Sequence, residues 1–176
     1  MIRALARKKG LCEAWTSEWN DNSSDDELTY KFVEGQNFCL KYDVPGINVI
    51  RSFDNEVLLN HNVYCDYKGT IHNPTDDIQQ KRIVICGDSD IDIILDGYTI
   101  CDIFIHHNSN VRILTKDNAI CYVNVAGSAK ISIINESVNA PSILNYSKEV
   151  SVSTIGNVKY HDKTEHGKQV SITTIK

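Results

Sequence analysis

The sequence predicts an α+β fold in which an N-terminal helical segment caps a short β-solenoid. Before residue 55, apolar residues recur at the three- to four-residue spacing of helices. After residue 55 they alternate with polar residues, and consecutive blocks of 20 residues align column by column. With 176 residues the chain fits one compact unit. We therefore expect a helical cap over residues 1–54 and a solenoid-like region over residues 55–176.

The first expected helix spans residues 2–20. Leu11, Trp15 and Trp19 lie four residues apart in this stretch, so one face of the helix is apolar. The interpretation we adopt for both tryptophans is packing against neighbouring structure rather than stacking on a ligand.

A second helix is expected over residues 25–42. Ser24 followed by Glu27 forms a capping box, in which the hydroxyl and the carboxylate each satisfy a free backbone N–H group. Pro45 and Gly46 end this helix, and "INVIRSF" after them predicts a short third one. The apolar face of the second helix holds Leu28, Phe32 and Cys39.

Three consecutive blocks carry the repeat. They are "DSDIDIILDGYTICDIFIHH" (88–107), "NSNVRILTKDNAICYVNVAG" (108–127) and "SAKISIINESVNAPSILNYS" (128–147). A fixed period of this length is the signature of stacked coils, because one block alone cannot bury its apolar side. The aligned columns are Ile91 with Val111 and Ile131, Ile93 with Ile113 and Ile133, Ile103 with Val123 and Ile143, and Cys101 with Cys121.

The repeat weakens on both sides of these blocks. The preceding block, 68–87, keeps Ile71, Ile83 and Ile85 in the same columns. The following one continues with Val150 and Val152, one residue early. Twenty strand residues give a contour of about 66 Å, enough for a flattened coil of two or three short strands. An antiparallel β-sandwich or meander with frequent turns stays open as the alternative fold.

One further column of aligned apolar residues lies directly after a column whose side chains are expected to point into the core. Ile94, Leu114 and Ile134 either turn a corner inward or form an exposed apolar strip, which the N-terminal helices or a second chain would cover. Phe104 and Tyr122 lie in other outward columns, where no aromatic platform builds up. The candidate interaction surface therefore consists of Ile94, Leu114, Ile134, Phe104 and Tyr122.

Catalytic and metal-binding motifs are missing from the sequence, so we expect no catalytic residue, no metal and no cofactor. Asp90 and Asp92 would lie about 6.6 Å apart along one side of a strand, near the carboxyl separation of inverting glycosidases. We interpret them as an acidic solvent face. Alternation sends His106 and His107 to opposite sides, so they cannot easily share a metal. The cluster His161–His166 is interpreted as a polar connector.

The composition limits the classes of binding partner and the cellular compartment that we expect for this protein. Apolar residues make up 41% and charged residues 23%, as in globular proteins. The net charge of −5 argues against nucleic acid, and no apolar run is long enough for a membrane span. Without a secretory signal pattern, and with six cysteines of which no two form C-x-x-C, we expect a cytoplasmic protein with buried thiols.

Two stretches together carry a resemblance, "ALARKKGLCEAW…FVEGQNFCLKYDVP" and "GYTICDIFIHHNSNVRILTKDNAICYVNV". They resemble a family of uncharacterised proteins from gut anaerobes and their mobile elements or prophages, which implies a helical segment before a repetitive β segment and no known activity. The β segment is also similar to the polymerising solenoid of bactofilins, from which the long helical start departs. The expected function is a non-enzymatic scaffold or a protein-interaction module that can self-associate. The alternative is a protein or enzyme that binds a polysaccharide or another extended ligand through a solenoid face.

Overall fold

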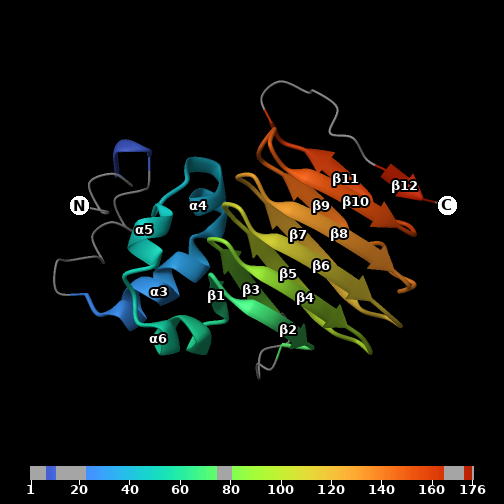
Figure 1. Ribbon diagram of the computed structural model, residues 1–176, viewed down its shortest axis with the longest axis horizontal. Coiled ribbons are helices and arrows are strands. Elements are labelled where there is room, and N and C mark those ends of the chain that lie inside the picture. Colours follow the sequence, from blue (N-terminus) through green and yellow to red (C-terminus); the bar gives the residue numbers. More distant parts are fainter. Residues whose placement is uncertain (1–6, 11–22, 75–80, 165–172, 176) are drawn as a thin grey trace.

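The β region is a flattened solenoid of two parallel sheets (Figure 1). The computed structural model describes residues 7–10, 23–74, 81–164 and 173–175. Odd-numbered strands form the first sheet, in the order β1-β3-β5-β7-β9-β11, and even-numbered strands form the second, in the order β12-β10-β8-β6-β4-β2. Every strand pair among the described residues is parallel, so the antiparallel sandwich or meander is wrong.

The strands are short and alternate regularly between the two sheets. Each coil therefore consists of one strand in each sheet. We expected two or three strands per coil, and the structure has two. The first sheet contains β1 (Val63–Cys65), β3 (Lys81–Cys86), β5 (Ile100–Ile105), β7 (Ile120–Val125), β9 (Ser142–Asn145) and β11 (Lys159–Asp162). The second sheet contains β2 (Lys68–His72), β4 (Asp90–Leu95), β6 (Asn110–Thr115), β8 (Lys130–Asn135), β10 (Ser151–Ile155) and β12 (Thr173–Ile175).

The expected columns of the three central blocks are confirmed residue by residue. Ile91 pairs with Val111, and Val111 pairs with Ile131. The same register brings Ile103, Val123 and Ile143 together, and it stacks Cys101 on Cys121.

The register differs from the expected one at both ends. Ile71 pairs with Ile93 and not with Ile91, because the connection after β2 is two residues longer. A shift of two residues keeps the side chain on the same face, and Ile71 is still buried. At the other end Val152 pairs with Ile131 and Thr154 with Ile133, so this coil runs one residue late rather than early.

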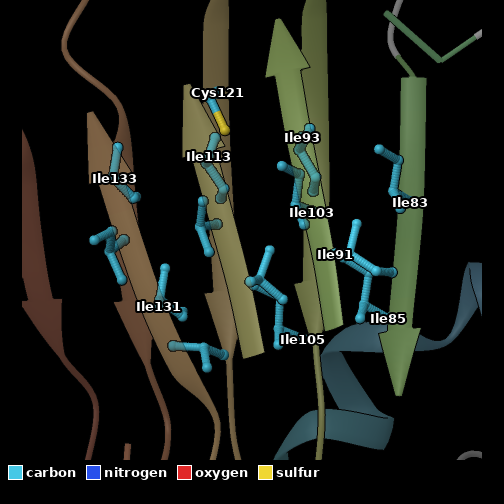
Figure 2. Close-up of a cluster of buried hydrophobic side chains, with 14 of the residues drawn as sticks. Ile83, Ile85, Ile91, Ile93, Ile103, Ile105, Ile113, Cys121, Ile131 and Ile133 are labelled. Carbon is cyan, nitrogen blue, oxygen red and sulfur yellow. The ribbon is translucent and has the colours of Figure 1, made fainter. Parts of the chain in front are cut away.

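The inward columns form a continuous apolar core between the sheets, and Figure 2 shows its isoleucines in rows across neighbouring strands. Cys101 and Cys121 belong to this core, so the expected sulfur ladder is confirmed. Burial raises the pKa of the Cys121 thiol to about 12.

Four helices precede the strands in the described part of the chain. The capping box is confirmed, since the Ser24 hydroxyl accepts from the Glu27 N–H at 3.2 Å and the Glu27 carboxylate accepts from the Ser24 N–H at 3.1 Å. The expected helix 25–42 is interrupted at Gly35, where the backbone leaves the helical conformation. The helices are α3 (Asp25–Glu34), α4 (Gln36–Tyr42), α5 (Ile47–Ile50) and α6 (Asn55–Asn60).

Two expectations at the helix boundaries need correction. Of the stretch 2–20 only residues 7–10 are described, and there the chain makes a turn at Gly10, which has φ of 94°. An uninterrupted helix through Gly10 is therefore wrong, while Trp15 and Trp19 lie outside the described residues. Helix α6 occupies the stretch after residue 55 where strands were expected, and the first strand begins at Val63.

The helices lie against the outer face of the first sheet, beside its first strands (Figure 1). Phe32 of α3, Leu40 of α4 and Leu58 of α6 share one apolar cluster with outward residues of the sheet, including Val84 and Phe104. The expectation that the helix bearing Phe32 covers Ile94, Leu114 and Ile134 is therefore wrong, because those three residues belong to the other sheet.

Candidate interaction surface

An apolar strip runs across the outer face of the second sheet. Its members are paired neighbours on β4, β6, β8 and β10, which we define as the apolar strip: Ile94, Leu114, Ile134 and Ile155. Ile134 is 40% exposed and Ile155 43%, whereas Ile94 and Leu114 are half-buried. The column faces outward, so the alternative of an inward-turning corner is wrong. Ile94, Leu114 and Ile134 line a shallow groove of about 370 Å³, whose other lining residues include Thr70, Asp92, Arg112 and Ser132.

Charged side chains border the strip. Arg112 donates to Asp90 at 2.7 Å and also binds Asp92. Its guanidinium holds the pKa of Asp90 below the ordinary value. A glycosidase acid must keep its proton near neutral pH, which needs the opposite shift. The geometry therefore favours a charged border over a catalytic pair of carboxylates.

The two aromatic members of the expected surface have different surroundings. Phe104 is 5% exposed, since it lies in the cluster beneath the helices, and Arg82 lies 5.9 Å from its ring centre. It is thus unavailable to another molecule, which corrects its place in the candidate surface. Tyr122 lies one coil further along the same sheet and is 43% exposed.

A second concave region lies between the end of α4 and the turns that follow β9 and β11. It has a volume of about 760 Å³, and three lysines line it: Lys41, Lys148 and Lys163. Tyr42 and Tyr146 add aromatic surface. We refer to this region as the lysine groove.

Two further side chains line the lysine groove. The carboxylate of Glu149 accepts a hydrogen bond from Ser128 at 2.8 Å and adds one negative charge to the three positive ones. The Thr164 side chain lies beside Asp162 and contributes to lowering the pKa of that carboxyl.

Two histidines join the helices to the first sheet. The His106 ring is buried and hydrogen-bonded to the Gln36 side chain at 2.6 Å, and burial lowers its pKa to about 3. His107 lies 3.4 Å from Asp43. The two rings stack at 5.6 Å instead of pointing to opposite sides, because His107 leaves the strand with φ of 58°.

The cluster His161–His166 is only partly described. His161 and Asp162 are exposed on β11, whereas Glu165 and His166 lie outside the described residues. In the described ranges, no three His, Cys, Asp or Glu side chains converge as a metal ion would require.

Comparison with known proteins gives no relative from which a function could be transferred. No family model, curated protein or solved structure matches the chain. The resemblance to proteins of gut anaerobes and mobile elements therefore stays a prediction. None of the described helices combines the length and the apolar character needed to cross a membrane.

Proposed function

We propose that the protein is a non-enzymatic interaction module that self-associates through the outer face of its second sheet. The observation that carries this proposal is the apolar strip, in which four branched side chains stack about 4.8 Å apart on a face that the helices leave open. Removing such a strip from water is favourable, and contiguous apolar surface of this kind marks interaction sites.

A second copy of the chain is the occupant that fits best. A two-fold axis parallel to β6 would place β4 of one copy opposite β8 of the other, so that Ile94 faces Ile134 and Leu114 faces itself. The same operation places Asp90 opposite Lys130. Arg112 would meet its own copy, but its charge is already balanced by Asp90 and Asp92. Apolar and charged columns thus match themselves, as an isologous interface requires.

Light scattering tests this proposal. The wild type should be a dimer or larger, and Leu114→Glu should be monomeric with an unchanged circular dichroism spectrum. The matched control is Tyr122→Glu, which adds the same charge at an exposed position of the other sheet. A wild type that remains monomeric at high concentration would overturn self-association, as would a Tyr122→Glu variant that dissociates equally.

A second candidate function is the binding of an extended acidic ligand, and the lysine groove supports it. Three lysines gather there on a chain whose net charge is −5, beside two tyrosines that can stack on sugar rings. An oligosaccharide of uronic acids has the required carboxylates and flat apolar faces.

Titration calorimetry with oligogalacturonate tests this second function. Binding should weaken with salt and should be lost in the double variant Lys41→Ala, Lys148→Ala, while Lys130→Ala on the other sheet should bind as the wild type does. Absence of binding, or equal binding of a neutral oligosaccharide, would exclude it.

The cytoplasm is the proposed compartment. Cys39, Cys65, Cys86, Cys101 and Cys121 are all free thiols. Unpaired cysteines are typical of a reducing environment, in which disulfides form only transiently.

A further inference from the structure

The first sheet contains two pairs of cysteines in register. Cys65 and Cys86 are the last residues of β1 and β3 and lie directly opposite each other. Cys101 and Cys121 are paired in the same way on β5 and β7. In-register residues of neighbouring strands lie about 4.8 Å apart, within the range of Cα separations of about 4.4–6.8 Å that a disulfide spans. By the Cα separation alone, either pair of cysteines could form a disulfide.

Their surroundings differ. Cys101 and Cys121 point into the core between the sheets and are 0% and 1% exposed. Cys65 and Cys86 lie on the outer face, in the cluster beneath the helices, and Cys65 is only half-buried. A small oxidant can therefore reach Cys65 from solvent, whereas the core pair is enclosed on all sides.

Cys65 and Cys86 are in-register neighbours, and each shifts the pKa of the other. The neighbouring Cys86 thiol lowers the pKa of Cys65, whereas Cys65 and burial raise the pKa of Cys86. Cys65, the more exposed thiol, therefore ionises more readily than Cys86 and is the one suited to attack an oxidant.

Charged groups next to Cys65 contribute in both directions. Arg51 at the end of α5 favours the thiolate, and Asp66, whose carboxylate lies 3.9 Å from the Cys65 sulfur, opposes it. The charge of Asp66 is largely engaged elsewhere. Its carboxylate accepts from the Arg51 guanidinium at 2.7 Å and from the Asp88 N–H at 2.8 Å, and Arg51 also binds the Asp88 side chain at 2.9 Å.

We propose that Cys65 and Cys86 form a redox-sensitive dithiol that a hydroperoxide oxidises to a disulfide between β1 and β3. The Cys65 thiolate attacks one peroxide oxygen, the O–O bond breaks, and Cys65 becomes a sulfenic acid while hydroxide leaves. The Cys86 sulfur then attacks the Cys65 sulfur and loses its proton, and the sulfenic oxygen departs as water. Overall, two thiols and one molecule of hydrogen peroxide give one disulfide and two molecules of water.

The position of the pair gives this reaction a structural consequence. Strand β1 is the edge strand of the first sheet and follows directly after α6, so the disulfide would tie the helical segment to the solenoid. Parallel side chains about 4.8 Å apart exceed the Cβ separation of about 3.5–4.5 Å that disulfides prefer. The bond would therefore be strained and easily reduced, as a reversible regulatory disulfide requires.

The experiment treats the folded full-length chain with hydrogen peroxide and maps every cysteine by peptide mass spectrometry. We expect a cross-linked Cys65–Cys86 peptide that dithiothreitol reverses, while Cys101 and Cys121 stay reduced. Oxidation of Cys65 should be at least about tenfold faster than that of either core cysteine, because reactivity follows the thiolate fraction. Equal rates for the two pairs would overturn the proposal.

Two variants separate attack from resolution. Cys86→Ser should leave a sulfenic acid on Cys65 that dimedone traps, and Cys65→Ser should leave Cys86 unreactive. Circular dichroism checks that both variants are folded. A sulfenic acid on Cys65 that persists in the wild type without bonding to Cys86 would overturn the proposal, as would faster oxidation of Cys86 in Cys65→Ser.

Discussion

At the scale of single residues, strand alternation assigns neighbours to opposite environments. Ile113 is 2% exposed and stacks between Ile93 and Ile133, whereas Leu114 faces outward in the apolar strip. Ile113→Asp would bury an unpaired charge and should destabilise the fold by several kcal/mol. The melting temperature, followed by circular dichroism, should fall by about 10 °C or more.

The matched control is the same charge one residue further along. Leu114→Asp places a carboxylate on the outer face, where water solvates it in the monomer, so its melting temperature should fall far less than that of Ile113→Asp. Equal losses for the two variants would mean that the inward and outward columns have been misassigned.

His106 provides a prediction about pH. Its pKa is about 3 in the folded protein and 6.5 without burial, so between these values the unfolded chain binds more protons. Stability should therefore fall as the pH drops through 6.5, by about 2 kcal/mol from this residue between pH 7.5 and pH 5. Asp43 adds a loss only at lower pH, since its folded pKa lies below 3.8 and its contribution is present above that value.

Urea denaturation at pH 7.5 and pH 5 measures this effect. His106→Asn should lower the stability at pH 7.5 and shrink the difference between the two pH values. His161→Gln serves as the control, because His161 is exposed on β11, and it should keep the wild-type difference. An undiminished difference in His106→Asn would refute the assignment to His106.

At the scale of elements, the sequence predicted what periodicity and local capping determine. The 20-residue period determined the pairing of the central strands, and Ser24 with Glu27 determined the start of α3. Connection lengths follow no period, which is why the positions of Ile71 and Val152 were misassigned. Helix α6 is only six residues long, too short for its apolar spacing to stand out from that of a strand.

The alternation of apolar and polar residues along a strand also could not predict which outward-facing residues are covered by a helix. Phe104 and Tyr122 share the outward face of the first sheet, but only Phe104 lies beneath the helices. The near-repeat spacing between Cys65 and Cys86, 21 residues, was a signal that could have revealed the dithiol. It stayed hidden because it differs by one residue from the period of the central blocks.

The same pair of aromatic residues tests how the helices are held. Phe104→Ala removes a buried ring from the contact between helices and sheet and should cost about 3–5 kcal/mol. Tyr122→Ala removes an exposed ring and should change stability by at most about 0.5 kcal/mol. Chemical denaturation measures both values, and similar losses for the two variants would contradict the packing of the helices on β5.

At the scale of the whole molecule, the outer faces of the two sheets have different surroundings. The first sheet is covered by the helices near its first strands, and the second presents the apolar strip. This division follows from the path of the chain after α6, which enters the first sheet at β1. A sequence pattern reports which residues point outward from each sheet, but it carries no information about which sheet the helices will meet.

Stacked coils also make a prediction about how the molecule opens. Each coil is stabilised by its neighbours, so terminal coils have one neighbour and central coils two. The helices pack on the first strands and supply the missing contacts there, whereas the helix cluster does not include β10 or β11. Hydrogen exchange followed by mass spectrometry should therefore be slowest in β4–β8, intermediate in β1–β3 and fastest in β10 and β11.

The variant Phe104→Ala adds a direct test of this order. Weakening the contact with the helices should speed exchange in β1 and β3 until it approaches that of β10, while exchange in β10 and β11 should not change. Uniform exchange along the solenoid would mean that it opens only as a whole. Faster exchange in β1–β3 than in β10 of the wild type would mean that the helices do not protect the first coils.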